Sequence, residues 1–218
     1  MIRTALIGCG GRGRGQLGEL SKLDDVELVA VCDPLPEVRT QAADEHGIER
    51  RYDSIEKMLD DGQIDAVFVT TPAHLNARAA LPCLEAGVPT LLEKPPGMHI
   101  EETHQLREAA ERSGAQAMVG WQRRFDPMVV EARRIIEGRG PIVQLVGEFH
   151  KSMADFERGG RFPEIVMQRM LMETPIHSID LVRALASSDV TEVHSAVSAD
   201  SRDTTTCTPP WYCSRTAV

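Results

Sequence analysis

Three glycines near the start of the chain, Gly8, Gly10 and Gly13, have the spacing G-x-G-x-x-G. They follow the apolar run 5–7, which predicts a short buried strand, and they precede a helical pattern of leucines. A strand, a tight glycine turn and a helix are the context that a dinucleotide fingerprint requires. Gly8 would allow the turn, Gly10 would let a pyrophosphate approach the backbone, and Gly13 would let helix and strand pack closely. The stretch therefore predicts a phosphate site on free N–H groups at the helix N-terminus.

An acidic residue supplies the second half of this fingerprint. The apolar segment 26–31 predicts a second strand, and Asp33 follows it, twenty positions after Gly13. An acid at this place accepts hydrogen bonds from the adenosine ribose hydroxyls and repels a 2′-phosphate, so it favours NAD over NADP. We place Gly11 and Arg12 among the cofactor-binding residues, because a bound phosphate would explain a cation where the helix dipole disfavours one. The alternative is that Arg12 is a solvated side chain.

Further polar residues follow the predicted strands at their carboxyl ends, where parallel sheets bind ligands. Lys94 is the chemically distinctive one, because the proline after it favours an extended conformation and would aim its side chain in a fixed direction. The alternative is a surface lysine with Glu93 as its solvated partner, as in most Glu-Lys pairs. The residues expected at this edge of the sheet are Gly8–Gly13, Asp33, Thr71, Pro72, Glu93, Lys94, Trp121 and Gln122.

A histidine and two acids form a second chemical candidate. His177 and Asp180 lie in a largely apolar stretch that predicts a helix, and Glu173 precedes them. Pro175 fits best at the first helical position with Thr174 as the cap, so Glu173 would lie just outside the helix start. A histidine, with an unperturbed pKa of about 6.5, suits proton transfer near neutral pH. The alternative is a packing helix with an incidental histidine.

Strands and helices alternate through the first part of the chain, and the strands are continuous apolar runs. This pattern is typical of a parallel sheet that is buried on both faces. We therefore predict an α/β fold with a doubly wound Rossmann sheet. Besides the helix after the glycine turn, the expected strands are 5–7, 26–31, 64–69, 88–92 and 115–119, and the expected helices are 37–46, 55–59, 73–86 and 100–113.

The character of the chain changes after the last of these strands. Asp126 and Pro127 predict the cap and the first turn of a new helix. Residues 142–150 alternate between apolar and polar side chains, as a strand of an open antiparallel sheet does. We therefore expect a Rossmann domain over 1–121 and a second, incomplete α/β domain with an open, mostly antiparallel sheet over 122–218.

The last part of the chain, residues 204–218, has neither strand nor helix periodicity and contains two cysteines. We interpret it as an atypical tail that follows a premature end. The second domain would then lack about a hundred residues, judged against ordinary domain sizes. Its strands would have an unpaired edge and uncovered apolar surface.

The composition of the 218-residue chain is that of a soluble globular protein, with 42% hydrophobic and 26% charged residues. A formal net charge of -9 argues against a nucleic-acid or anionic membrane surface as the partner. No apolar run approaches the roughly 18 residues that a membrane span needs, and the N-terminus lacks the form of a signal peptide. The five cysteines have no metal-ligand spacing and suit a reducing compartment, so we expect a cytoplasmic enzyme or binding protein without a metal site.

Several motifs in a fixed order carry a family resemblance. They are the glycine fingerprint, Asp33, Thr71-Pro72-Ala-His74-Leu-Asn76, Glu93-Lys94-Pro95, Gly120-Trp-Gln-Arg-Arg-Phe-Asp-Pro127 and Ile176-His177-Ser-Ile-Asp180. Together they resemble the glucose–fructose oxidoreductase, inositol dehydrogenase and rhizopine catabolism family of nicotinamide-dependent oxidoreductases. The resemblance covers residues 1 to about 200 and is closest to the inositol 2-dehydrogenase-like members.

The resemblance implies that the second domain binds the substrate and mediates homo-oligomers in the full-length family fold. It also implies a small polyol as substrate, Lys94 as the family's lysine near the nicotinamide and His177 as its catalytic histidine. Glu173 stands where many members have an aspartate, and Asn76 stands where many have a histidine. For Trp121 and Arg124 a packing role is the alternative to a substrate contact. The implied cofactor-binding residues, beyond the fingerprint, are Thr71, Pro72, His74, Asn76, Glu93, Lys94 and Gln122, and the implied substrate-binding residues are Lys94, Trp121, Arg124, Glu173 and His177.

The implied chemistry is oxidation of a secondary hydroxyl on a sugar or cyclitol, with hydride transfer to NAD. His177 would accept the hydroxyl proton, and Lys94 would hydrogen-bond the oxygen and stabilise its negative charge. Glu173 would orient His177 or bind a neighbouring substrate hydroxyl. Which of Lys94 and His177 takes the proton stays open at this point. NADP is the second choice of cofactor, since Arg12 and Arg39 could accommodate a 2′-phosphate.

Two other functions remain as alternatives. One is a truncated, catalytically inactive fragment that binds a dinucleotide, which NADH binding without turnover of any polyol would favour. The other is a different Rossmann enzyme, such as a short-chain dehydrogenase or a methyltransferase. Short-chain dehydrogenases use a Tyr-x-x-x-Lys, and neither Tyr52 nor Tyr212 has a lysine four positions on. A methyltransferase would not explain Lys94 together with His177.

Overall fold

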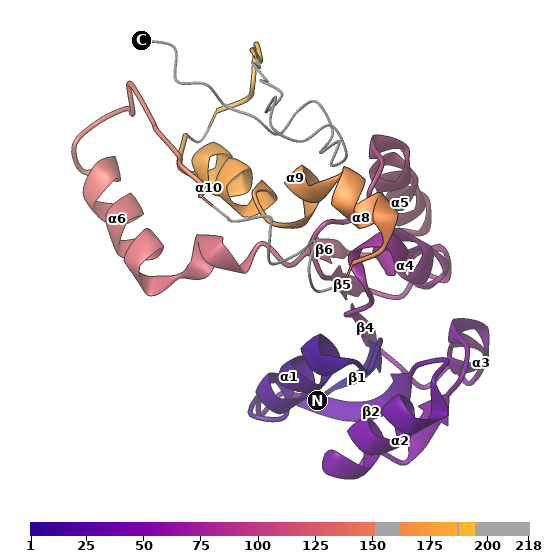
Figure 1. Ribbon diagram of the computed structural model, residues 1–218. Helices are drawn as coiled ribbons and strands as arrows, with labels where there is room; N and C mark the ends of the chain where they lie inside the picture. Colours follow the sequence, from indigo (N-terminus) through magenta and orange to yellow (C-terminus); the bar gives the residue numbers. More distant parts are fainter. Residues whose placement is uncertain (151–161, 187, 195–218) are drawn as a thin grey trace. The chain divides into compact units, whose positions relative to one another are not determined.

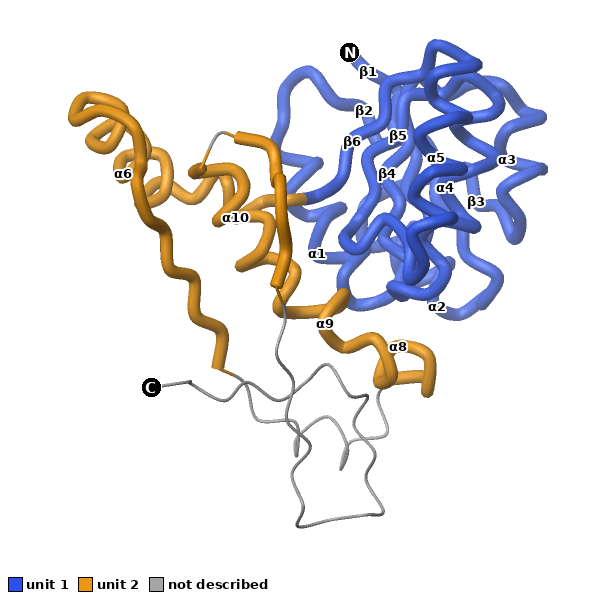
Figure 2. Tube along the Cα trace, turned by 90° about the horizontal axis from the view of Figure 1, so that it is seen from above, with its two compact units in different colours: residues 1–120 blue, residues 121–218 orange. Residues whose placement is uncertain are grey.

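The computed structural model describes residues 1–150, 162–186 and 188–194. The chain forms two compact units, which are residues 1–120 (unit 1) and residues 121–218 (unit 2) (Figure 2). The glycine turn, Asp33 and Lys94 lie in unit 1, whereas His177 lies in unit 2. The tail predicted over 204–218 lies outside the described residues.

Unit 1 is built on a six-stranded parallel sheet with the strand order β3-β2-β1-β4-β5-β6. This order is that of a doubly wound Rossmann sheet, and its switch point, where ligands bind, lies between β1 and β4. The predicted parallel sheet is therefore confirmed. The strands are β1 (Ile2–Ile7), β2 (Val26–Cys32), β3 (Arg50–Tyr52), β4 (Ala66–Val69), β5 (Thr90–Leu92) and β6 (Ala117–Val119) (Figure 1).

Helices cover both faces of this sheet. On one face Leu6, Val31 and Phe68 pack with Leu17 of the first helix and with the second helix. On the other face the neighbouring strand residues pack with the third, fourth and fifth helices. Successive strand residues point to opposite faces, so both must be apolar, which explains the continuous apolar runs. The helices of unit 1 are α1 (Gly11–Leu20), α2 (Pro36–Glu45), α3 (Ile55–Asp60), the short 3₁₀ turn η1 (Ala73–Leu75), α4 (Asn76–Glu85) and α5 (Ile100–Ser113).

The structure adds one strand that the sequence did not predict. β3 lies at the edge of the sheet and pairs with β2, where Arg50 opposes Ala30 and Tyr52 opposes Cys32. Arg51, between them, is exposed. An edge strand borders solvent and needs no continuous apolar run, so its sequence resembles a polar connection. The predicted strands 64–69, 88–92 and 115–119 start two residues later in the structure than in the prediction.

The described part of unit 2 consists of helices and connecting segments. The helix predicted at Pro127 is confirmed, and Asp126 caps it by accepting a hydrogen bond from the Met128 N–H at 2.9 Å. The cap satisfies one of the N–H groups that have no partner inside a helix. The elements are η2 (Gln122–Phe125), α6 (Pro127–Glu137), α8 (Glu164–Gln168), α9 (Met170–Glu173) and α10 (Ile176–Ala186).

The strand predicted over 142–150 is not formed. This segment has no regular secondary structure, and Val143 and Val146 within it are 98% and 70% exposed. Alternation decides which side chains share a face, whereas a strand also needs a second segment with which to pair. The described residues of unit 2 contain no strand to pair with it. The open antiparallel sheet of the second domain stays a prediction.

Candidate functional site

The glycine turn joins β1 to α1 and is tight on one side only. Gly8 has a φ of 91°, in the left-handed region that favours glycine. A Cβ on Gly13 would lie 2.0 Å from the carbonyl oxygen of Gly8, so a larger residue would push α1 away from the turn. Gly10 and Gly11 are exposed, and a Cβ on either would meet no atom within 4 Å. Gly8 and Gly13 therefore pack against protein atoms, whereas Gly10 and Gly11 leave space for a phosphate to approach the helix N-terminus.

Asp33 is buried at the end of β2, and its carboxylate binds two backbone groups. Oδ2 accepts a hydrogen bond from the Cys9 N–H at 2.8 Å, and Oδ1 accepts one from the Leu35 N–H at 2.9 Å. A carboxylate has about four acceptor positions, so about two remain for ribose hydroxyls. Arg39 donates from Nη1 to the carbonyl oxygen of Asp33 at 2.5 Å. This bond uses one of the five N–H donors of Arg39, which together with Arg12 was a candidate partner of a 2′-phosphate.

A cavity of about 750 Å³ opens at the carboxyl ends of β1, β2 and β4. Its volume falls in the range of about 300–1,000 Å³ that is usual for small-molecule sites. The polar part of its wall suits a phosphate and a ribose, and the apolar part suits a flat ring such as adenine. The polar wall includes Gly10, Gly11, Arg12, Asp33 and Thr71, and the apolar wall includes Leu35, Val38, Ile55, Leu75 and Ala79.

Asn76 begins α4 and is fully buried. Its Nδ2 donates hydrogen bonds to the carbonyl oxygens of Glu93, at 2.9 Å, and Pro95, at 3.0 Å. Its Oδ1 accepts a hydrogen bond from the Thr71 hydroxyl at 2.9 Å. The side chain has no exposed surface for the cofactor contact that the resemblance implied, because these three bonds and its burial commit it to the protein. Asn76 instead ties the segment after β4 to the segment after β5.

Glu93 and Arg12 lie close together at this edge of the sheet. Oε1 of Glu93 lies 3.5 Å from Nε of Arg12 and accepts a hydrogen bond from Nε2 of Gln16, also at 3.5 Å. The Arg12 side chain is 57% exposed, so it has ample surface for a phosphate contact. Glu93 is buried, which contradicts the alternative of a solvated Glu93–Lys94 surface pair. Lys94 itself is half-buried directly after Glu93.

His74 lies in η1, directly after Pro72 and Ala73. Its Nδ1 atom is buried and has no hydrogen-bond partner among the described residues. Leaving a buried polar atom without a partner costs about 1–3 kcal/mol, so such atoms are often satisfied by a ligand or a water molecule. Thr71 and Pro72 line the cavity, whereas His74 does not, so the expected contact of His74 with the cofactor stays a prediction.

Unit 1 contains three buried cysteines, and none of them is a reactive nucleophile. Cys9, Cys32 and Cys83 are free thiols. Burial raises the pKa of each to about 12, and the charge of Asp33 adds to the rise at Cys9 and Cys32. The thiolate is the reactive form of cysteine, so these side chains act as small core residues at neutral pH.

His177 lies near the start of α10 in unit 2 and is 5% exposed. The ring of Trp121 meets it edge-on, with ring centroids 6.0 Å apart and an interplanar angle of 88°. Glu173 ends α9, just before the helix that carries His177, which agrees with the predicted placement. Its Oε2 accepts a hydrogen bond from the Thr174 hydroxyl. Trp121 and His177 are thus in ring contact within unit 2, and Glu173 lies four positions before His177 in the chain.

Arg124 makes a two-pronged ion pair with Asp180. Its Nε donates to Oδ2 at 2.8 Å and its Nη2 donates to Oδ1, and these hydrogen bonds raise the pKa of Arg124. The Asp180 side chain is 8% exposed and that of Arg124 is 39% exposed. The ion pair gives Arg124 a structural role, and its substrate contact stays a prediction. Gln122, at the start of η2, is exposed, and its expected contact with the cofactor stays a prediction.

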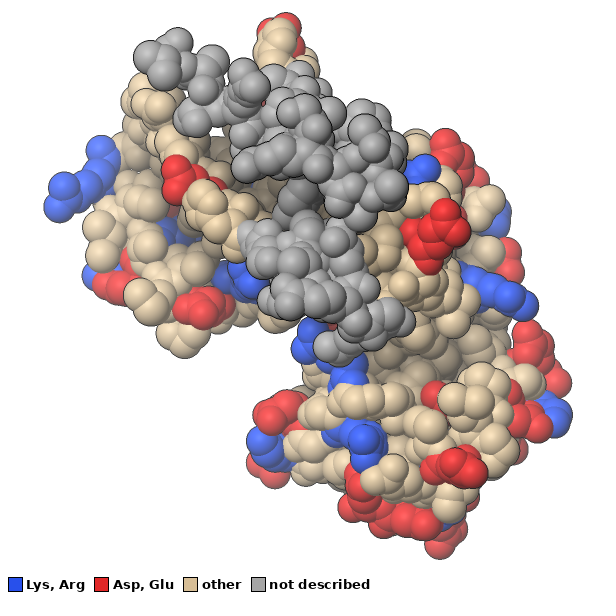
Figure 3. Space-filling model, in the orientation of Figure 1, with Lys and Arg blue, Asp and Glu red and all other residues tan. Residues whose placement is uncertain are grey.

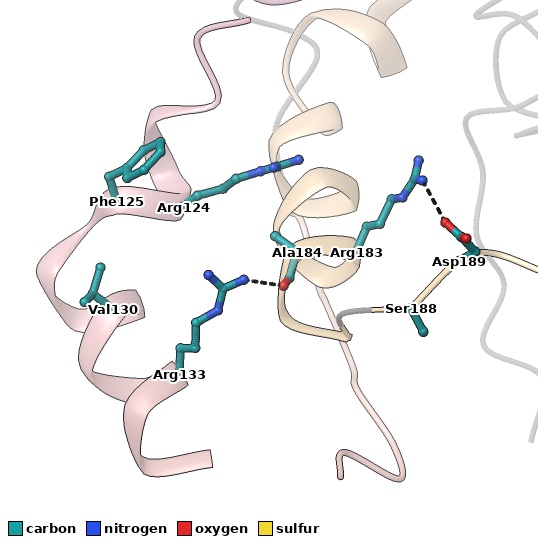
Figure 4. A pocket seen from close by; sticks show the side chains of 8 residues that line it. All are labelled: Arg124, Phe125, Val130, Arg133, Arg183, Ala184, Ser188 and Asp189. Atoms are coloured by element: carbon teal, nitrogen blue, oxygen red, sulfur yellow. Dashed lines mark hydrogen bonds and ion pairs between the residues drawn. The ribbon is translucent and has the colours of Figure 1, made fainter. Parts of the chain in front are cut away.

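A second cavity, of about 690 Å³, lies in unit 2 and was not predicted from the sequence (Figure 4). At this cavity Nη2 of Arg133 donates a hydrogen bond at 2.6 Å to the carbonyl oxygen of Ala184, which lies 51 positions later in the chain. Arg183 lies 3.5 Å from Asp189. No motif or spacing marks residues so far apart in the sequence. The lining residues are Arg124, Phe125, Val130, Arg133, Arg183, Ala184, Ser188 and Asp189, and each arginine among them already binds an acceptor.

The predicted reaction centre draws on both units. Lys94 belongs to unit 1, and Glu173 and His177 belong to unit 2, so their meeting at one substrate stays a prediction. On the face of unit 1 that Figure 3 shows, acidic and basic side chains are interspersed. Across 1–150, 162–186 and 188–194 no three His, Cys, Asp or Glu residues cluster as metal ligands would. None of the described helices is long and apolar enough to cross a membrane.

A family model described as "Oxidoreductase family, NAD-binding Rossmann fold" matches residues 2–121. The match contains all six strands of the sheet together with the glycine turn, Asp33 and Lys94. It covers more than half of the chain.

Relatives match beyond this region. The scyllo-inositol 2-dehydrogenase (NAD(+)) of Bacillus subtilis (strain 168) is 29% identical over 195 residues, which are 88% of this chain and 56% of that protein. The solved structure of myo-inositol 2-dehydrogenase from Lactobacillus plantarum is 26% identical, with a TM-score of 0.75 over 86% of this chain and 57% of that one. Scyllo-inositol dehydrogenase from Lactobacillus casei, solved with NAD(H) and scyllo-inositol, has a TM-score of 0.75 at 22% identity over 86% of this chain and 56% of that one, which shows the shared fold. The chain spans about 56% of the length of such relatives.

Proposed function

The chain belongs to the oxidoreductase family with an NAD-binding Rossmann fold, and from this premise we propose that it serves the oxidation of a secondary hydroxyl on a sugar or cyclitol. The family resemblance and the Rossmann sheet that the sequence predicted are confirmed. The proposal rests on one observation, which is that three predicted site elements follow strands of the same parallel sheet at its carboxyl edge. They are the open glycine turn, Asp33 and the segment of Lys94.

NAD, when bound, supplies the hydride acceptor for the reaction. Gly10, Gly11 and the N–H groups that begin α1 would bind its pyrophosphate, and Asp33 would bind the adenosine ribose through its remaining acceptor positions. The preference for NAD over NADP is supported by the buried negative charge of Asp33, which repels a 2′-phosphate.

Lys94 and His177 would share the proton chemistry. Lys94 would donate a hydrogen bond to the reacting hydroxyl oxygen and stabilise the negative charge that forms on it. His177 would accept the proton through a ring nitrogen. Glu173 would orient the imidazole ring or bind a neighbouring hydroxyl of the substrate. The edge-on contact with Trp121 would hold the imidazole in place.

The remaining parts of the proposal concern the substrate class and the cell compartment. A small polyol matches the substrates in the names of the relatives, which include inositol dehydrogenases and a D-apiose dehydrogenase. The three free, buried thiols suit the reducing conditions of the cytoplasm. NAD binding without turnover is the second candidate. It is favoured by the apolar surface of unit 2, where Met128 is 82% and Val143 is 98% exposed.

The experiment is a screen of cyclitols and sugars with NAD, followed by the absorbance of the NADH formed. We expect one class of polyol to be oxidised, and Lys94→Ala and His177→Ala to lower the rate by about 100-fold or more, as the loss of an acid–base group does. Lys57→Ala and His104→Ala replace exposed residues of the same types and should keep the rate of the unmodified chain. Unchanged rates in both site variants would refute the assigned roles. NADH binding with no turnover of any polyol would establish the second candidate.

A further inference from the structure

Asn76 holds the two peptide groups that flank Lys94. The carbonyl oxygens of Glu93 and Pro95 stand one residue before and one residue after Lys94, and both accept hydrogen bonds from the same Nδ2 atom. An amide nitrogen has two hydrogens, so this arrangement uses both of them. A single side chain thus fixes the backbone on either side of the lysine.

The other end of the same amide reaches the nucleotide cavity. Thr71 donates its hydroxyl hydrogen to Oδ1 of Asn76, and Thr71 lines the cavity of about 750 Å³. Asn76 itself is 0% exposed, so neither water nor a ligand competes for its bonds. The three hydrogen bonds of the Asn76 amide therefore connect Thr71, in the cavity wall, to the backbone on either side of Lys94.

We propose that Asn76 is a positioning residue, which fixes Lys94 relative to the Thr71 wall of the nucleotide cavity. The importance of Lys94 rests on the proposed function, whereas its attachment to Asn76 does not. A buried asparagine that only stabilised the fold would be expected to bind backbone groups anywhere in the core. All three partners of Asn76 instead lie just past the carboxyl ends of β4 and β5, the edge at which parallel sheets bind ligands.

The chain offers a direct spectroscopic test, because its only lysines are Lys22, Lys57, Lys94 and Lys151. Reductive ¹³C-methylation of the folded chain labels each lysine and leaves its positive charge intact. Lys94→Arg identifies the Lys94 signal, and the exposed Lys22 and Lys57 serve as internal references. We expect the Lys94 signal to differ from these references in the unmodified chain and to move toward them in Asn76→Ala.

A second pair of variants keeps the test decisive if Asn76→Ala does not fold. Thr71→Val removes one bond to Asn76 and should move the Lys94 signal in the same direction, while Thr71→Ser should restore it. Thr90→Val is the matched control, because Thr90 lies on β5 and its hydroxyl binds the Val88 carbonyl at 2.9 Å instead. A Lys94 signal that stays in place in folded Asn76→Ala, or in Thr71→Val where Asn76→Ala fails to fold, would overturn the proposal.

Nucleotide binding separates this inference from the proposed function. If NADH binds, the displaced lysine should lower kcat by about 100-fold, as a misplacement near 1 Å does, while the KM for NAD changes little. If NADH does not bind and the Lys94 signal still follows Asn76, the proposed function fails and the positioning role stands. If a polyol is oxidised and the signal ignores Asn76, the function stands and the positioning role fails.

Discussion

Unit 1 and unit 2 differ in how completely they bury their apolar side chains. In unit 1 two clusters cover the two faces of the sheet and include fully buried leucines such as Leu6, Leu17 and Leu84. Among the buried apolar residues of the described chain, only Val166, Met170 and Pro175 belong to unit 2. The turn η2 and helix α6 expose large apolar side chains, with Phe125 of η2 at 65% and Met128 of α6 at 82%.

Most of the apolar core lies in unit 1, whereas the predicted catalytic residues are divided between the two units. Each square ångström of buried apolar surface contributes about 25 cal/mol to folding, so the two-faced core makes unit 1 the more stable unit. Unit 1 also contains the whole of the cavity at the glycine turn. Unit 2 contains His177, the predicted proton acceptor, in a setting with little core of its own. We therefore expect nucleotide binding to survive changes that disrupt proton transfer.

Among the single substitutions, the largest change in stability is expected from Gly13→Ala. The added Cβ would lie 2.0 Å from the Gly8 carbonyl oxygen, so either α1 or the turn must move. Overpacking of this kind costs about 3 kcal/mol, and the shift would also misplace the phosphate site. Urea unfolding of unit 1 and NADH titration measure the two effects.

Gly15→Ala is the matched control on the same helix. A Cβ at Gly15 meets no atom within 4 Å, so the substitution should stabilise α1 by about 0.5–1 kcal/mol. Equal stability of the Gly13 and Gly15 variants would refute the close packing of α1 on the glycine turn.

Alkaline pH should destabilise unit 1 through its buried thiols. Cys9, Cys32 and Cys83 ionise near 12 in the folded chain, compared with an ordinary pKa of 9.0, so the folded state binds more protons between these values. Stability is therefore complete below pH 9.0 and falls as the pH rises toward 12, by up to about 1.4 kcal/mol per pH unit for each thiol. Urea unfolding at increasing pH measures the slope. Cys83→Ala should make it shallower, and an unchanged slope would contradict the account.

Limited proteolysis should cut unit 2 before unit 1. Its exposed apolar segments indicate low local stability, and we expect cleavage there to be about tenfold faster or more, leaving a resistant fragment that ends near Gly120. Mass spectrometry of the fragments identifies the boundary. A single compact core that includes residues 122–200 would show that unit 2 is as stable as unit 1.

The smallest effect is expected from Arg124→Ala. Removing the guanidinium leaves the nearly buried Asp180 carboxylate without its partner, but Arg124 is partly exposed, so the cost is about 1 kcal/mol within unit 2. Arg134→Ala breaks an exposed pair with Glu131 and should cost less than about 0.5 kcal/mol. Hydrogen exchange of α10 reports the change. NADH affinity should stay unchanged, because Arg124 and Asp180 both lie in unit 2, and a shift in it would contradict this expectation.

The sequence predicted the parts of the fold that depend on local pattern. Continuous apolar runs predicted β1, β2, β4 and β5, because strands buried on both faces need apolar residues at every position. Edge strand β3 was missed, because Arg50–Tyr52 borders solvent and carries no such run. The strand over 142–150 was wrong, because alternation specifies faces but not a pairing partner.

In the candidate site, too, local pattern predicts single residues but not contacts between distant segments. The spacing of Gly8, Gly13 and Asp33 was enough to predict the glycine turn and an acid near it. The role of Asn76 was not predictable, because its partners at 71, 93 and 95 are brought together by two strand ends rather than by spacing. The Arg124–Asp180 pair likewise joins residues 56 positions apart, which no local pattern reveals.

We expect unit 1 to bind NAD at the glycine turn and Asp33. Calorimetric titration with NADH and, separately, NADPH measures this binding, with Asp33→Ala as the site variant and the exposed Asp60→Ala as its control. We expect saturable binding of NADH that is at least about tenfold tighter than that of NADPH, which corresponds to about 1.4 kcal/mol. Asp33→Ala should abolish the preference, and Asp60→Ala should retain it. Binding of neither nucleotide, or equal affinity for both in the unmodified chain, would contradict the account.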